Sequence, residues 1–269
     1  MAQLTAIIQA RMGSRRLPGK VLRPLVGRPL LWHVVRRIRA VSHVAQVVVA
    51  TSVNPLDEAI VRFCNDEGIP CFVGSEDDVL DRFYRTASIY GADPVMRFTA
   101  DCPCVDPQIV TDVIEMYFRE PGRYDYVAVA TGAGAANDAC AGRRFPDGLD
   151  AEIFSFDALE RAHRDAVDAV EREHATLRIW SRPDEYRIGL LFSPSDLSHY
   201  RWTVDDEKGW AFVASLYEHL FREDRNFGLH DVLRLLSDYP ELREACTDPH
   251  VQEQYRQFYP TKRDGARWG

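Results

Sequence analysis

Long hydrophobic runs are missing from this chain of 269 residues. Its apolar runs, such as Val47–Ala50, are far shorter than the ~20 residues of a membrane-crossing helix. The first residues also lack the charged-then-apolar pattern of a secretory signal. Six cysteines are too few for a disulfide-dense secreted domain. We therefore expect a cytoplasmic protein without membrane contact, and its 46% hydrophobic and 28% charged residues are typical of a globular chain.

Acidic residues are absent from the first 56 positions, which hold nine arginines and lysines. The whole chain nevertheless has a net charge of −8, so the remainder is strongly acidic. Overall acidity disfavours nucleic acid as a partner, because nonspecific binding needs a broad positive surface. A basic start within an acidic chain suits a compact polyanion, such as a triphosphate, held in a cleft. Lys20 is one of only three lysines, which favours a point charge in a tight site.

Several familiar motifs are also missing. The eight histidines show no H-x-x-x-H or H-E-x-x-H spacing, and Cys102 and Cys104 have no second pair at zinc-site spacing. The basic segment Gln9–Lys20 (QARMGSRRLPGK) matches neither Walker A nor G-x-G-x-x-G. A zinc site, a P-loop ATPase and a dinucleotide-dependent dehydrogenase are therefore disfavoured, and the two cysteines are predicted to be buried, inert thiols.

The chain does contain a regular alternation of short apolar runs and amphipathic segments. The predicted strands are 4–9, 45–51, 70–73, 94–99, 124–130, 149–155, 186–192 and 200–204. The predicted helices are 29–41, 55–68, 77–90, 106–118, 156–167, 171–180, 206–221 and 229–236. This alternation predicts an α/β fold with a doubly wound, mostly parallel sheet covered on both faces. The Gly- and Ala-rich segment 131–144 is expected to be a mobile excursion.

Charged and small residues gather where predicted strands end. In sheets of this kind ligands bind at the carboxyl ends of the strands. Gly13 and Gly19, after the first strand, allow backbone N–H groups to close around phosphate oxygens. Asp101 follows the strand 94–99, and one or two carboxylates suffice for Mg²⁺. Asp106, followed by Pro107, is predicted to cap the next helix.

These segments resemble, in order along the chain, the motifs of the cytidylyltransferase family that includes CMP-Kdo and CMP-sialate synthetases. The resemblance is closer to its SpsF-type branch of spore-coat polysaccharide synthesis. It rests on IIQARMGSRRLPGKVL, GSEDDVLDRF, DCPCVDP, FPDGLDAEIFS, EREHAT and RWTVD, from Ala6 to about Leu236. Arg15 departs from the usual Thr, and Ala100 from the common Gly.

The resemblance implies a single nucleotide-diphospho-sugar transferase-like domain over 1–240. Its nucleotide-binding half would be 1–130, and 131–240 would contain a small projection for the acceptor and for homodimer formation, with a C-terminal tail at 241–269. The implied reaction is Mg²⁺-dependent transfer of CMP from CTP to a sugar acceptor, with release of pyrophosphate, for surface polysaccharide or glycoconjugate synthesis.

The resemblance also assigns residues. The nucleotide would contact Ala10, Arg11, Gly13, Ser14, Arg16, Lys20, Ser75, Arg97 and Thr99, with Arg11, Arg16, Lys20 and Asp101 as the catalytic set. Asp101 and Asp205 would hold the metal, and Asp206 is expected to begin the next helix. The acceptor would lie against Asp147, Asp150, Glu152, Glu173 and His174. Alternation independently predicts that Asp150 and Glu152 share one face of a strand.

Alternatives remain open at this point. Related folds use other nucleoside triphosphates with sugar 1-phosphates, and the acceptor could be an ulosonic or nonulosonic acid, a phosphate or a phosphonate. A GT-A glycosyltransferase would show a D-x-D metal motif, which Asp101-Cys-Pro lacks. A sugar-nucleotide sensor would bind CTP without turnover. Residues Glu171 to His174 could simply form a salt-bridged helix surface.

Overall fold

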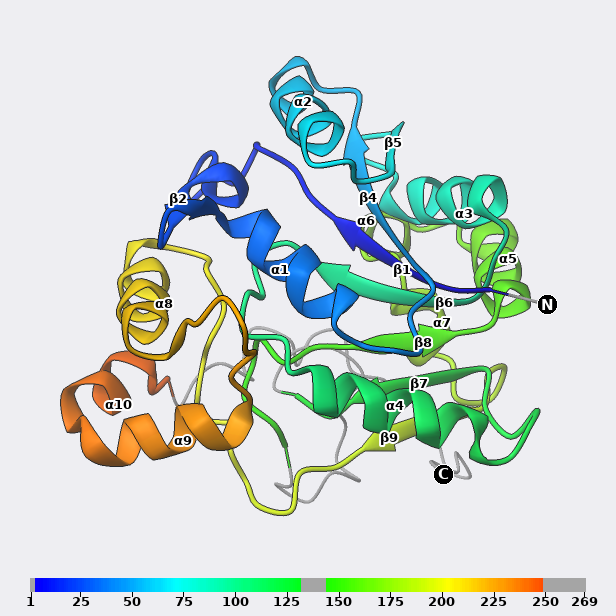
Figure 1. The fold of residues 1–269 in the computed structure, drawn as a ribbon. Helices are drawn as coiled ribbons and strands as arrows, with labels where there is room; N and C mark the ends of the chain where they lie inside the picture. The colour runs from blue at the N-terminus through cyan, green and yellow to red at the C-terminus, as the bar shows by residue number, and fades with distance from the viewer. Residues whose placement is uncertain (1–2, 132–143, 249–269) are drawn as a thin grey trace.

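A seven-stranded sheet with the order β5-β4-β1-β6-β8-β7-β9 forms the centre of the molecule (Figure 1). The computed structural model describes residues 3–131 and 144–248. The strands are β1 (Gln3–Gln9), β4 (Gln46–Ser52), β5 (Cys71–Gly74), β6 (Ala92–Thr99), β7 (Tyr126–Val129), β8 (Glu152–Phe154) and β9 (Ile188–Leu191). All neighbours pair in parallel except β8, which is antiparallel to β6 and to β7. The prediction of a mostly parallel sheet is confirmed.

Helices cover both faces of this sheet, as predicted. They are α1 (Leu30–Arg39), α2 (Glu58–Asp66), α3 (Val79–Tyr90), α4 (Pro107–Arg119), α5 (Phe156–Asp165), α6 (Ala169–Glu173), α7 (Leu177–Trp180), α8 (Glu207–Leu220), α9 (Leu229–Asp238) and α10 (Pro240–Cys246). Side chains of α1, α2, α4 and α8 to α10 belong to one apolar cluster, and those of α3, α5 and α7 to another. Figure 1 views the molecule from the side of α1 and α4.

The central strand β1 shows why the sheet is buried on both faces. Its successive side chains point to opposite sides. Ala6 and Ile8 therefore lie in the cluster beneath α1, and Ile7 lies in the cluster beneath α3. A strand covered on both sides requires a continuous apolar run rather than an alternating one. This is the pattern that made β1 and β4 recognisable in the sequence.

The chain order places the switch point of the sheet between β1 and β6. From β1 the chain moves outward to β4 and β5, and then returns to the other side of β1 as β6. Gln9 and Thr99 are register partners at the carboxyl ends of these two strands. The loops that leave the two strands therefore begin side by side, where sheets of this class bind ligands.

Acidic side chains cap the N-termini of α4 and α8, as predicted for Asp106 and Asp206. Asp106 caps α4 by accepting a hydrogen bond from the Gln108 amide at 2.8 Å. Asp206 caps α8 by accepting from the Gly209 amide at 2.8 Å. Both satisfy amides that a helix leaves unpaired at its N-terminus.

Two predicted elements are wrong. Residues 200–204 form no strand, because their backbone groups bond to three separate partners instead of one ladder. The Arg201 amide donates to the Cys246 carbonyl, the Trp202 amide to that of Asp147, and the Val204 amide to that of Asp101. The predicted helix 171–180 is two short helices, α6 and α7, because the backbone leaves the helical region at His174.

Some structure was not predicted from the sequence. Pro24–Leu25 (β2) and Arg28–Pro29 (β3) form a small antiparallel hairpin before α1. A short 3₁₀ helix, η1 (Lys20–Leu22), precedes β2, whereas η2 (Pro55–Asp57) forms the start of the predicted helix 55–68, ahead of α2. Helix α10 packs against α8 and α9. The expected mobile excursion falls almost entirely on 132–143, outside the described residues. Within the described ranges, no helix is both long and apolar enough to span a membrane.

Candidate active site

The loop after β1 is closed on itself through the peptide groups of Met12. The Met12 carbonyl accepts hydrogen bonds from the amides of Ser14 and Gly19, both at 2.9 Å. Gly19 adopts a φ of 73°, which favours glycine, and the chain then enters η1 at Lys20. The Ser14 hydroxyl accepts from the Leu17 amide at 3.3 Å. The loop therefore has a defined shape that brings its basic residues to the end of β1.

A buried aspartate that was not identified in the sequence anchors this loop. Asp57, in η2, is 1% exposed. Its Oδ1 accepts from the Met12 amide at 2.6 Å, and its Oδ2 accepts from the Ser52 hydroxyl at 2.5 Å. The carboxylate thus links the loop after β1 to the end of β4. An acid in the first turn of a helical segment resembles an ordinary capping residue, so the sequence carries little signal for this role.

Lys20 joins the two aspartates that were predicted to hold a metal ion. Its Nζ donates to Asp101 Oδ2 at 2.8 Å and to Asp205 Oδ1 at 3.1 Å. The backbone explains this meeting of distant segments, because the Val204 amide donates to the Asp101 carbonyl at 2.9 Å and thereby places Asp205 beside it. Arg16 adds a second cation, 3.4 Å from Asp205. Four residues expected to act together are therefore within contact of one another.

The charges in this group stabilise each other. Burial by itself would lower the pKa of Lys20, but Asp101 and Asp205 outweigh it and hold that pKa above its usual value. Burial would likewise raise the pKa of Asp101, but the ammonium of Lys20 holds it below its usual value. The lysine is thus protonated and Asp101 is ionised at neutral pH.

The two aspartates provide the donors that Mg²⁺ prefers. Oxygens of Asp101 and Asp205 contact the same ammonium nitrogen, so the distance between them cannot exceed the sum of those two hydrogen bonds. Among the described residues, no group of three or more His, Cys, Asp or Glu side chains is arranged to hold a metal ion. Mg²⁺ is commonly held by one or two carboxylates and completed by water and phosphate oxygens. The chemistry of the pair fits a magnesium ion of that kind.

Further acids from the antiparallel part of the sheet lie near this pair. Asp147 is 2% exposed, and its Oδ2 has no hydrogen-bond partner. Burial and the negative charges of Asp150 and Asp205 hold the pKa of Asp147 well above its usual value. An unsatisfied oxygen in such a place is available to a hydrogen-bond donor.

Asp150 and Glu152 are held by different partners. Asp150 accepts from the Thr131 hydroxyl and from the Gly148 amide. Glu152, on β8, pairs with Arg97 of the adjacent strand β6, and Arg97 also donates to the Gln9 side chain at 3.1 Å. The predicted strand 149–155 is shorter in the structure, because β8 begins at Glu152, so Asp150 precedes the strand and the two acids do not share one strand face. Burial raises the pKa of Asp150, and the charge of Glu152 adds to this effect.

Other predicted site residues are arranged as follows. Arg11 is exposed on the loop, and burial followed by the charge of Arg11 lowers the pKa of Arg82. The Ser75 hydroxyl accepts from the Asp78 amide at 3.0 Å, within the turn that begins α3. Ala10 is buried, and its amide bonds to the Ala50 carbonyl. Thr99 contacts the sulfur of Cys102 at 3.1 Å.

The segment around His174 gives a mixed picture. Glu173 and His174 are exposed at the end of α6. Although the residue as a whole is exposed, desolvation of its ring lowers the pKa of His174, and the charge of Arg97 also lowers it. Glu171 instead points into the protein and pairs with Arg182 at 2.9 Å. Glu171 is therefore salt-bridged, as the alternative expected, but it is buried and is not part of a helix surface. Cys102 and Cys104 are buried free thiols, as predicted.

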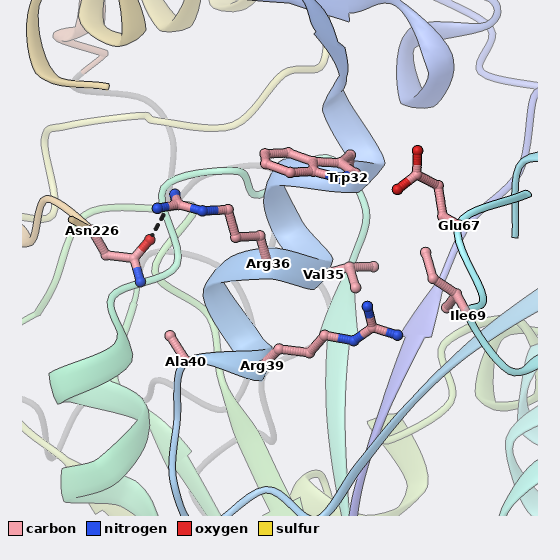
Figure 2. Close-up of a pocket in the computed structure, with 8 residues that line it drawn as sticks. All are labelled: Trp32, Val35, Arg36, Arg39, Ala40, Glu67, Ile69 and Asn226. Carbon is pink, nitrogen blue, oxygen red and sulfur yellow. Dashed lines mark hydrogen bonds between the residues drawn. The ribbon is translucent and has the colours of Figure 1, made fainter. Parts of the chain in front are cut away.

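A separate surface cavity of about 350 Å³ lies over α1 (Figure 2). Figure 2 shows Arg36 bonded to Asn226, while Arg39 extends between Ala40 and Ile69. Ala40 precedes β4 and Ile69 precedes β5, so this part of the cavity adjoins the amino ends of the strands. Lys20 and its two aspartates lie at the carboxyl ends and take no part in it.

A doubly wound sheet whose switch point carries a basic, glycine-containing loop and a pair of aspartates is the arrangement of a nucleotidyltransferase. The similarity to known proteins is more specific. Residues 5–243 match the family model described as cytidylyltransferase, and the chain belongs to that family.

Individual relatives agree with this assignment. The spore coat polysaccharide biosynthesis protein SpsF of Bacillus subtilis is 32% identical over 91% of this chain and 100% of its own length. An uncharacterized protein of Methanocaldococcus jannaschii is 31% identical over 95% of this chain and 98% of its own. The 3-deoxy-manno-octulosonate cytidylyltransferase of Trichlorobacter lovleyi is 34% identical over 45% of this chain and 47% of its own. The SpsF-type resemblance is confirmed.

A solved structure supports the fold over most of the chain. A cytidylyltransferase from Leptospira borgpetersenii superposes with a TM-score of 0.81 at 25% identity, covering 90% of this chain and 97% of that one. The protein is therefore a nucleotidyltransferase of the cytidylyltransferase family.

Proposed function

We propose that this protein transfers CMP from CTP to an oxygen of a sugar acceptor, with the help of Mg²⁺, and releases pyrophosphate. The observation that carries the proposal is the contact of Lys20 with both Asp101 and Asp205 at the switch point of the sheet. It unites, in one place, a cation suited to phosphate and two carboxylates suited to a metal ion.

The basic loop would receive the phosphates of the nucleotide. Arg11, Arg16 and Lys20 would neutralise the β- and γ-phosphates, which leave as pyrophosphate. Arg11 and Arg16 are exposed, and Arg16 also contacts Asp205 at 3.4 Å, whereas the loop that supports them is fixed by Asp57. Phosphoryl-type transfer depends mainly on positioning and on charge neutralisation, which is what such a loop supplies.

Asp101 and Asp205 would hold the magnesium ion. When bound there, the ion would supply positive charge at the α-phosphate and lower the energy of the charge that develops in the transition state. The two carboxylates would hold it beside the loop, and Thr203 orients Asp205 by donating to its Oδ2 at 3.0 Å.

The acceptor would enter from the β7–β8 side of the site, where Asp147, Asp150 and Glu152 lie, with Glu173 and His174 at its margin. The unpartnered Oδ2 of Asp147 is suited to receive a hydrogen bond from an acceptor hydroxyl. An acceptor oxygen would form a bond to the α-phosphorus as the bond between that phosphorus and the bridging oxygen breaks, so that pyrophosphate carries the electron pair away. Where that oxygen belongs to a hydroxyl, its proton would pass to water.

A matrix of nucleotides and acceptors tests this proposal. The four ribonucleoside triphosphates are combined with a panel of ulosonic and nonulosonic acids, sugar phosphates and sugar phosphonates, and pyrophosphate release is measured. We expect release with CTP and one class of acceptor, dependent on Mg²⁺. Release with a different triphosphate alone, transfer of sugar from a nucleotide sugar without pyrophosphate, or CTP binding without turnover across the panel would each contradict the proposal.

A pair of variants tests the residues. Asp101→Ala should lower turnover by at least about 10²–10³-fold, because the charge it holds acts at the transition state. Asp66→Ala, at an exposed position on α2, is the control and should keep wild-type turnover. Circular dichroism should show both variants folded. Normal turnover by a folded Asp101→Ala protein would remove Asp101 from the mechanism.

A further inference from the structure

The carboxylate oxygens of Asp101 and Asp205 are already engaged by the protein itself. Lys20 bonds to one oxygen of each. The remaining oxygen of Asp101 accepts a long hydrogen bond from the Cys102 thiol at 3.7 Å. The remaining oxygen of Asp205 accepts from Thr203 at 3.0 Å and faces Arg16 at 3.4 Å. A cation could not bind to both aspartates without displacing the ammonium of Lys20.

The positive and negative charges around Asp101 and Asp205 also neutralise one another. Lys20 and Arg16 provide two positive charges, and the two aspartates provide two negative ones. Arg201 lies 4.0 Å from Asp205 but is itself paired with Asp206 at 3.1 Å. A divalent cation that arrives alone meets an ammonium already in its place. A polyphosphate that arrives alone meets cations whose charge the aspartates already neutralise. Each ligand therefore meets protein groups of opposite charge to its own, but these groups are already paired with each other.

Movement of one side chain would remove both obstacles. The side chain of Lys20 is 9% exposed, and its ammonium group is carried by a flexible four-carbon stem. Lys20 is the first residue of η1, on the loop that would face the phosphates. If a polyphosphate draws Lys20 away, the two aspartates lose the one cation that they share, while Arg16 and Arg201 remain 3.4 and 4.0 Å from Asp205 alone. Two adjacent carboxylates without a shared cation repel each other and have increased affinity for a divalent ion.

We propose that Lys20 occupies the place of the divalent cation in the nucleotide-free protein, and thereby makes the binding of cation and polyphosphate mutually dependent. The identity of the two ligands rests on the proposed function. Because coupling between two ligands is reciprocal, the cation must also favour polyphosphate binding. The free protein would consequently bind neither ligand strongly alone.

Binding of Mn²⁺ to the nucleotide-free full-length chain, followed by electron paramagnetic resonance, tests this inference. We expect weak binding by the wild type and a dissociation constant at least about tenfold lower for Lys20→Met, which removes the charge and retains the stem. Lys20→Arg keeps the charge and should bind Mn²⁺ as weakly as the wild type. Lys208→Met, at an exposed position on α8, controls for loss of a lysine and should be unchanged.

Two further results decide the interpretation. Adding Asp101→Asn and Asp205→Asn to the Lys20→Met chain should abolish the gained Mn²⁺ binding. If Lys20→Met does not fold by circular dichroism, Lys20→Gln takes its place. Equal Mn²⁺ affinity of wild type and the uncharged variant, or a gain in Lys20→Arg, would overturn the inference.

The outcome is separable from that of the proposed function. Pyrophosphate release by the wild type from CTP and Mg²⁺ with no change in Mn²⁺ binding on loss of the Lys20 charge would reject only the inference. A gain in Mn²⁺ binding in a protein that never releases pyrophosphate would support the role of Lys20 at the cation position and reject the proposed reaction.

Discussion

The amide of Met12 donates a hydrogen bond to the carboxylate of Asp57 across 2.6 Å, although the two residues are 45 positions apart in the chain. Met12 is also the residue whose carbonyl closes the basic loop by accepting from Gly19. One buried carboxylate therefore holds the peptide on which the shape of the loop depends, without contacting any of its basic side chains.

We expect Asp57→Asn to weaken nucleotide binding through the loop. The new amide nitrogen would face the Ser52 amide or the Met12 amide, so a donor would meet a donor, and loss of a charged hydrogen bond should cost about 1.5–3 kcal/mol of stability. The KM for CTP in pyrophosphate release should rise about tenfold or more if about 1.4 kcal/mol of that loss falls on the bound state.

Asp106→Asn is a matched control for this prediction. Asp106 is also buried and accepts backbone amides from Gln108 and Leu229, but it holds α4 and α9 instead of the loop. It should lose comparable stability in urea denaturation while its KM for CTP stays near the wild-type value. Equal KM effects of the two substitutions would show that Asp57 acts only through general stability.

The example of Asp57 shows where prediction from the sequence stops. Apolar runs and amphipathic periods identified most strands and helices, because burial on one or both faces leaves a repeating pattern. The pattern does not give strand direction, so the antiparallel β8 was not predicted. A contact such as Met12 to Asp57 leaves no periodic trace at all, since it joins an ordinary helix-start acid to a loop amide.

Asp101 and Asp205, unlike Asp57, were both identified from the sequence. The sequence places Asp101 at the end of a strand, and the family motifs indicate Asp205, but the strand predicted at 200–204 is absent. The two acids meet because the Val204 amide bonds to the Asp101 carbonyl. A long-range hydrogen bond of this kind brings the two site residues together, whereas the residue types alone indicate only which chemistry they can perform.

The Arg97–Glu152 pair provides a stability prediction. The side chains are 17% and 8% exposed. Arg97→Met should lower the free energy of unfolding by about 3–5 kcal/mol, because it leaves a buried carboxylate without its partner. The double variant Arg97→Met, Glu152→Leu should recover much of that loss, as measured by urea denaturation.

An exposed pair supplies the comparison. Glu58 and Arg62 on α2 are 69% and 64% exposed, and Arg62→Met should change stability by no more than about 0.5 kcal/mol. If the double variant at the buried pair were as unstable as Arg97→Met alone, the loss would come from packing of Arg97 and not from an unpaired charge.

Asp150 should give the stability a recognisable dependence on pH. Burial raises its pKa from 3.8 to about 6, and the charge of Glu152 adds to the effect. Between about pH 4 and 6 the unfolded chain has therefore released a proton that the folded chain retains. Because the unfolded state binds fewer protons in this window, the contribution of Asp150 to stability decreases as the pH rises through it, and is constant above it.

Asp150→Asn should remove this contribution. The difference in unfolding free energy between variant and wild type should shift by about 2 kcal/mol in favour of the variant from pH 4 to pH 6, at 1.36 kcal/mol for each pKa unit. Urea denaturation at several pH values measures the difference. A flat difference for Asp150→Asn across this range would contradict an elevated pKa.

Gly148 lies between Asp147 and Asp150 in the chain and packs against the segment that carries Asp205. Its φ is 103°, and a Cβ atom there would lie 2.8 Å from the carbonyl carbon of Trp202. The neighbouring residue Asp147 exchanges backbone hydrogen bonds with this segment, donating to Tyr200 and accepting from Trp202. Substitution at Gly148 must therefore move backbone, not a flexible side chain.

We expect Gly148→Ala to reduce both stability and turnover. Backbone strain and overpacking each cost about 1–3 kcal/mol, and displacement of 202–205 would separate Asp205 from Asp101. Gly122→Ala isolates the first effect, because Gly122 has a φ of 76° but a Cβ there meets nothing within 4 Å. It should lose stability in urea while keeping its rate of pyrophosphate release. If Gly148→Ala also kept the wild-type rate, close contact with Trp202 would not be what positions Asp205.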